Sequence, residues 1–128
     1  MERHSFPDTT VPKAYGAYSH AVEAGDFIFV AGQTARNATG EFAGGDVASQ
    51  TKRCIEIVAD ILSRFGLTIH DIARCTVYLS DINDFAAMNA VFAEAFGGKF
   101  PARSTPEVQM PYGAKVGLEV TAYRGSRR

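Results

Sequence analysis

Apolar and polar positions alternate along the chain with two periods, and each change of period marks an element. Residues 18–24 and 27–31 read as two short strands that the Gly25–Asp26 turn joins into a hairpin. Between residues 46 and 65, apolar side chains recur every three or four positions. This spacing predicts an amphipathic helix, and Asp46 is a suitable residue to cap its first turn.

The second half of the chain repeats the change from strand to helix. Residues 73–80 alternate as a strand, and a second helix begins after Asp81 and stops at Gly97. Two further strands are expected near 103–108 and 115–123. The predicted order is therefore β-β-α-β-α-β-β.

This order predicts an α+β fold in which two helices cover one face of a mixed sheet. The chain reads as a single domain over residues 1–128, with an irregular N-terminal segment over 1–12. The strand at 27–31 is apolar on both faces, because Phe27 and Phe29 alternate with other apolar residues. Two helices cannot cover both faces, so we expect the sheet to pack against another subunit.

Composition narrows the classes of function. Hydrophobic residues make up 46% and charged residues 21% of the 128 residues, which is typical of a globular domain. The net charge is -1, and no basic stripe is present to bind nucleic acid. No stretch approaches the ~20 apolar residues of a membrane span. The N-terminus also lacks the apolar core of a signal peptide, so we expect a soluble, cytoplasmic protein.

The chain carries few groups for covalent or metal chemistry. Cys54 and Cys75 both fall on apolar phases of their elements, which favours buried, reduced thiols over a disulfide or a nucleophile. The three histidines are scattered, and no phosphate-binding glycine loop or serine-nucleophile motif occurs. We therefore expect no metal and no organic cofactor. Two classes of function remain: a cofactor-independent reaction on a small molecule, and binding of a small molecule without a reaction.

Two charged residues suggest where such a molecule binds. Arg103 follows the Phe100–Pro101 turn and enters a strand, so it is poorly placed for a freely solvated charge. Its planar guanidinium offers paired donors that fit a carboxylate. Glu119 lies on the polar phase of a strand whose other phase is apolar. Together they suggest a small-molecule site, although either alone is more often an ordinary salt-bridge residue.

Five segments then carry a resemblance to a known family. They are Gly16–Val22, Ala31–Gln33, Asp84–Asn89, Phe100–Ser104 and the strand that holds Glu119. In order and spacing they resemble the Rid family, the YjgF/RidA type of enamine/imine deaminase. The resemblance covers roughly residues 13–124, and its most specific part is the Pro-Ala-Arg-Ser segment followed by the glutamate.

This resemblance implies a chorismate-mutase-like protomer in a homotrimer, with a central barrel of sheets and three sites between subunits. It implies that Arg103 grips a substrate carboxylate, that Glu119 positions the hydrolytic water, and that Tyr18 lines the cleft from a neighbouring subunit. The other substrate-binding positions that it implies are Ala31, Gly32, Asn89, Ser104 and Thr105.

The chain departs from the family pattern at four positions. Ala17 replaces a proline, His20 a glutamine, Ala31 a frequent serine and Thr105 a frequent cysteine. His20 reads as a packed histidine more readily than as a site residue. The departures do not affect Arg103, the residue that the resemblance assigns to the substrate carboxylate. They put the identity of the substrate in question.

The resemblance implies hydrolysis of 2-aminoacrylate and 2-iminobutanoate to 2-oxo acids and ammonia, without a cofactor. A second hypothesis is a small-carboxylate-binding trimer that acts as a sensor or chaperone-like partner. A third is a deaminase or hydrolase of a larger catabolic imine. The neutral charge opposes a ribonuclease activity, which is attached to parts of the family.

Overall fold

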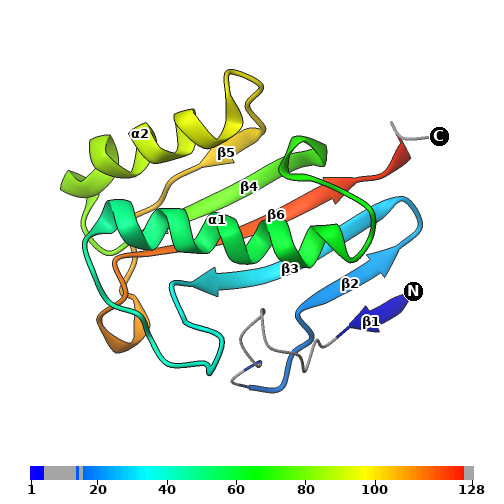
Figure 1. Ribbon diagram of the computed structural model, residues 1–128, viewed down its shortest axis with the longest axis horizontal. Coiled ribbons are helices and arrows are strands. Elements are labelled where there is room, and N and C mark those ends of the chain that lie inside the picture. Colours follow the sequence, from blue (N-terminus) through cyan, green and yellow to red (C-terminus); the bar gives the residue numbers. More distant parts are fainter. Residues whose placement is uncertain (5–13, 15, 126–128) are drawn as a thin grey trace.

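Two helices lie against one face of a six-stranded sheet in the computed structural model, which describes residues 1–4, 14 and 16–125 (Figure 1). The strands are β1 (Glu2–His4), β2 (Ala21–Ala24), β3 (Phe27–Thr34), β4 (Ile72–Leu79), β5 (Ala102–Ser104) and β6 (Val116–Tyr123). The helices are α1 (Val47–Ser63) and α2 (Phe85–Phe96), with single 3-10 turns at Ile69–Asp71, Ile82–Asp84 and Pro111–Gly113.

The strand order across the sheet is β1-β2-β3-β6-β4-β5. β4 and β5 pair in parallel and the other neighbours pair antiparallel, so the predicted α+β class with a mixed sheet is confirmed. The expectation of an irregular segment over 1–12 was wrong at its start, because Glu2–His4 forms β1 and pairs with β2. Three residues are too few for an alternating pattern to reveal a strand. Residues 5–12 lie outside the described part of the chain.

The ends of the helices follow the predicted signals. Asp46 caps α1, and its carboxylate accepts a hydrogen bond of 2.8 Å from the backbone N–H of Ser49. That bond is the main reason why the pKa of Asp46 is lowered. Gly97 ends α2 with φ 62°, in the left-handed region that glycine enters without strain. The 3-10 turn after Asp81 delays the start of α2 to Phe85.

The core lies between the helices and the covered face of the sheet. Ile57, Ile61 and Met88 of the two helices are fully buried against strand residues such as Val120. Both cysteines are free and buried, as predicted. Burial raises the pKa of the Cys54 thiol to about 12 and that of the Cys75 thiol to about 11. Both therefore stay protonated and inert near neutral pH.

Neither described helix covers the other face of the sheet (Figure 1). Phe27, Phe29 and Tyr123 are 43%, 46% and 41% exposed there, and the rings of Phe27 and Tyr123 lie 5.2 Å apart. We call this surface the open face. One side of the 27–31 strand is therefore apolar, as predicted, and the described residues leave it uncovered.

The edge strand β5 is shorter than the 103–108 strand that the sequence predicts. Pro106 has no N–H to donate, so the regular ladder cannot continue through it. The chain nevertheless stays beside β4, because Leu79 donates to the carbonyl of Pro106 at 3.0 Å and accepts from Val108 at 2.8 Å. Among the described residues, no helix is both long and apolar enough to cross a membrane.

Candidate functional site

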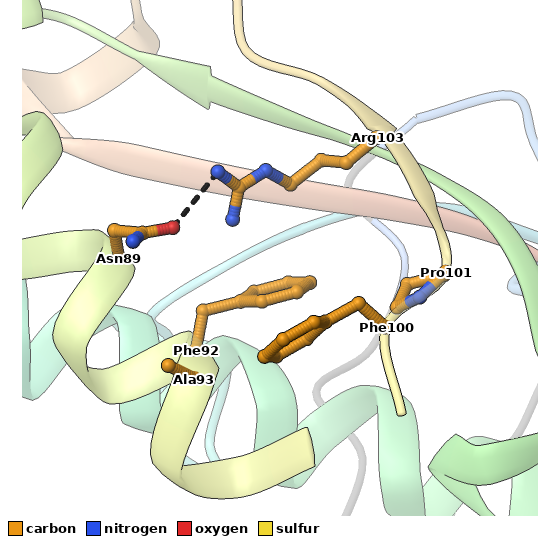
Figure 2. Close-up of a pocket in the computed structure, with 6 residues that line it drawn as sticks. All are labelled: Asn89, Phe92, Ala93, Phe100, Pro101 and Arg103. Carbon is orange, nitrogen blue, oxygen red and sulfur yellow. Dashed lines mark hydrogen bonds between the residues drawn. The ribbon is translucent and has the colours of Figure 1, made fainter. Parts of the chain in front are cut away.

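Arg103 lies on β5 with its side chain directed toward α2 (Figure 2). Its Nη2 atom donates a hydrogen bond of 2.9 Å to Oδ1 of Asn89. The centre of the guanidinium lies 4.8 Å from the ring centroid of Phe92 and 5.4 Å from that of Phe85. Cation–π contact and one hydrogen bond therefore fix the orientation of the guanidinium plane.

The local sequence explains why Phe85, Asn89 and Phe92 surround the guanidinium of Arg103. We call these three residues the Arg103 cradle. Phe85, Asn89 and Phe92 are spaced by four and three residues, so they share one face of α2. β5 pairs with β4 in parallel, and Arg103 stands opposite Cys75, a residue of the helix-covered face. The side chain of Arg103 thus leaves the sheet on the side where α2 presents these three residues.

Among the described residues, the guanidinium of Arg103 has no acidic partner. Arg103 forms no ion pair with any residue in the described part of the chain, and its one hydrogen bond there is to an uncharged amide. Beside it lies a hollow of about 320 Å³, lined by Asn89, Phe92, Ala93, Phe100, Pro101 and Arg103. A cation next to apolar walls suits a carboxylate that carries a short alkyl chain.

Glu119 lies elsewhere on the protomer. Its neighbours Leu118 and Val120 point into the core, and Glu119 itself belongs to the open face, opposite Thr76 in register. It accepts a short hydrogen bond from the Tyr78 hydroxyl, which is the main reason why the pKa of Tyr78 is raised. The protomer therefore places Glu119 and Arg103 on opposite faces of the sheet.

A second hollow, of about 220 Å³, lies beside Glu119 on the open face. Polar side chains from two neighbouring strands line it, together with one aromatic ring. They are Arg74, Thr76, Glu119, Thr121 and Phe29. The open face is therefore divided between an aromatic part, formed by Phe27, Phe29 and Tyr123, and a polar part beside Glu119.

The other predicted site residues divide into two groups. Asn89 contacts Arg103 directly, and Thr105 follows two residues after Arg103 in the chain. Ser104 pairs with Thr76, so it belongs to the open face although it is the next residue after Arg103. The second group belongs to the β2–β3 side of the sheet and comprises Tyr18, Ala31 and Gly32. β6 and β4 separate β3 from β5, so one protomer does not bring the second group to Arg103. Tyr18 is 41% exposed.

Sequence analysis missed three aromatic residues of these two sites. Phe85 and Phe92 contact the guanidinium of Arg103, and their spacing from Asn89 in the sequence already marks a shared helix face. Tyr78 lies on the same phase of β4 as Thr76 and contacts Glu119. His20 is 2% exposed, which confirms a packed histidine.

One group of potential metal ligands lies near β1. Ligand atoms of Glu2, His4 and Glu23 all come within 4.8 Å of one another. Arg124 already forms an ion pair of 2.7 Å with Glu23, so this group is part of a surface charge network.

Comparisons with known proteins agree on one family. The family model described as Endoribonuclease L-PSP matches residues 9–124. A RutC family protein of Pyrococcus abyssi is 46% identical over 115 residues, covering 88% of this chain and 91% of its own. The 2-iminobutanoate/2-iminopropanoate deaminase of Capra hircus is 35% identical over 127 residues, covering 98% and 93%. The crystal structure of the YjgF gene product from E. coli superposes with a TM-score of 0.88 at 35% identity, covering 97% and 99%.

Proposed function

The chain belongs to the Endoribonuclease L-PSP family, also called the YjgF/RidA family, and from this premise we propose that it hydrolyses small enamines and imines that carry a carboxylate. The proposed substrates are 2-aminoacrylate and 2-iminobutanoate, and the products are 2-oxo acids and ammonia. Relatives about 35% identical to this chain carry the name of 2-iminobutanoate/2-iminopropanoate deaminase, which supports this choice.

The observation that carries the proposal is the cradle around Arg103. The guanidinium is held by Asn89 and Phe92 and faces a hollow with apolar walls, without an acidic partner in the described part of the chain. A substrate carboxylate would supply the missing negative charge through two parallel hydrogen bonds. The apolar walls would hold the alkyl part of the substrate, so that the imine carbon has a fixed position.

The proposed reaction needs one water molecule and no cofactor. The enamine 2-aminoacrylate first moves a proton from its nitrogen to C3, which gives the imine tautomer. Water adds to the imine carbon while the imine nitrogen takes up a proton, and the resulting carbinolamine expels ammonia as the C–O bond becomes a carbonyl. Arg103 orients the substrate, and Glu119 orients the water and accepts its proton. The imine is already electrophilic, so few catalytic groups are needed.

We further propose that the protein is a homotrimer with its sites between subunits. Phe27, Phe29 and Tyr123 leave an aromatic surface on the open face that packing against other subunits would cover. Assembly would also account for the distribution of the predicted site residues, since Tyr18 and Glu119 lie away from Arg103 within one protomer.

Binding without catalysis is the second candidate, and one observation favours it. The side chains of Arg103 and Glu119 project from opposite faces of the sheet. Within one protomer, carboxylate binding by Arg103 therefore does not depend on Glu119. A trimer that only binds 2-oxo acids would keep the Arg103 cradle and would not need an acid beside it.

A coupled assay distinguishes the two. Threonine dehydratase generates 2-iminobutanoate, semicarbazide traps the imine that remains, and release of 2-oxobutanoate is followed with and without the protein. We expect wild-type protein to accelerate release and Arg103→Ala to lose the acceleration. Imines made by an amino acid oxidase from leucine and phenylalanine extend the series to larger side chains.

The result assigns the function. Binding of 2-oxobutanoate without acceleration for any imine would support the binding protein and refute the enzyme. Acceleration confined to the larger imines would move the substrate toward a bulkier catabolic imine. Equal acceleration by wild type and Arg103→Ala would show that the cradle is not the substrate site.

A further inference from the structure

We infer that Tyr78 is a positioning residue for Glu119, holding one carboxylate oxygen while the other stays available to water in the hollow on the open face. The inference rests on the proposed role of Glu119 as the group that orients water. The Tyr78 hydroxyl donates to Oε1 of Glu119. In the described part of the chain, Oε2 has no hydrogen-bond partner.

The sheet register brings the two side chains together. On β6, Gly117 stands opposite Tyr78 and Glu119 stands opposite Thr76. Tyr78 and Glu119 are therefore diagonal neighbours on one face, a separation that a long aromatic side chain can span.

Thr76 stands beside this contact. Its side chain lies two residues before Tyr78 on the same strand face, and it lowers the pKa of Tyr78 by less than Glu119 raises it. The proton of the Tyr78 hydroxyl is donated to the carboxylate of Glu119.

This arrangement sets a division of roles. Because the bond to Glu119 raises the pKa of Tyr78, the phenol keeps its proton and does not act as a base. Tyr78 restricts the rotation of the carboxylate, so the free oxygen of Glu119 keeps one direction before water arrives. Thr76 and Glu119 both line the hollow of about 220 Å³, which has room for that water.

Kinetics of Tyr78→Phe test this role. We expect kcat for imine hydrolysis to fall by about tenfold, the range of one hydrogen bond to a charged group, while KM stays within about twofold. Tyr123→Phe is the matched control, because Tyr123 lies on the same face and its hydroxyl has no hydrogen bond among the described residues. The double variant Tyr78→Phe/Glu119→Gln should be no slower than Glu119→Gln alone. An unchanged kcat in Tyr78→Phe, or additive losses in the double variant, would overturn the inference.

A titration separates failure of this inference from failure of the proposed function. The near-ultraviolet absorbance of the phenols is followed against pH in wild type and in Glu119→Gln. We expect one tyrosine to ionise at lower pH in Glu119→Gln, because the charge that opposes ionisation of Tyr78 is gone. Superimposable curves would show that Tyr78 does not hold Glu119, whatever the activity. An inactive wild type with a shifted curve would refute the proposed function and leave the contact established.

Discussion

Replacing Arg103 with lysine tests whether shape as well as charge binds the substrate carboxylate. Lysine keeps the positive charge and loses the planar fork of donors. The change also removes the hydrogen bond of 2.9 Å to Asn89 and the stacking of the guanidinium over Phe92 at 4.8 Å. The ammonium would then no longer be held in one orientation beside the hollow.

The expected loss of affinity is that of one charge-assisted hydrogen-bonded pair. A charge-assisted hydrogen-bonded pair contributes on the order of 1.5–3 kcal/mol, which corresponds to roughly tenfold to hundredfold in affinity. We expect Arg103→Lys to weaken binding of 2-oxobutanoate within this range. Because Arg103 is only half-buried at the edge of the sheet, the substitution should leave the fold intact.

Isothermal calorimetry with 2-oxobutanoate measures the loss, and thermal unfolding verifies that both proteins are folded. Arg3→Lys is the matched control, since Arg3 is an exposed arginine on β1, at the far edge of the sheet. A dissociation constant for Arg103→Lys equal to that of wild type would refute the proposed pair of hydrogen bonds from the guanidinium to the carboxylate.

Further predictions concern the acid, the thiols, the assembly and the absence of a cofactor. Glu119→Gln can still hydrogen-bond water but cannot accept its proton, so turnover should fall by about 10²–10⁴ with ligand affinity near that of wild type; wild-type turnover would make Glu119 structural. With pKa values raised by burial to about 12 and about 11, Cys54 and Cys75 should resist a thiol reagent at pH 8 and react once the protein is unfolded; rapid labelling of the native protein would contradict their burial. Light scattering should give three times the chain mass of 13.8 kDa, and Phe29→Lys should weaken the assembly; a wild-type monomer at micromolar concentration would refute the homotrimer. Imine hydrolysis should survive a chelator and dialysis, and activity restored by a divalent ion would contradict this.

The order of the main elements could be predicted because each has a clear period or end signal. The α1 helix repeats apolar residues at three and four, and Asp46 and Gly97 mark the ends of helices by well-understood chemistry. The strand β1 was missed, because three polar residues without alternation gain their structure only from pairing with β2. β5 was predicted too long, because the regular ladder cannot continue through Pro106, which has no N–H to donate.

The two halves of the candidate site differ in how far sequence could predict them. Arg103 and Glu119 stand out as charged residues within apolar elements, and the polar phase of Glu119 already places it on the face opposite the core. The side chain of Arg103 projects from the helix-covered face because β5 pairs with β4 in parallel. No local sequence pattern encodes that pairing. The contact between Tyr78 and Glu119 depends on the register between β4 and β6, and register is likewise a property of the assembled sheet.

The location of a bound 2-oxo acid tests the central claim most directly. A crystal structure of the protein with 2-oxobutanoate should show the carboxylate on the guanidinium of Arg103, with the alkyl chain in the hollow beside Phe92 and Phe100. The open face offers a second arginine, Arg74, beside Glu119. A carboxylate bound to Arg74, with the hollow beside Arg103 left without ligand, would contradict the account.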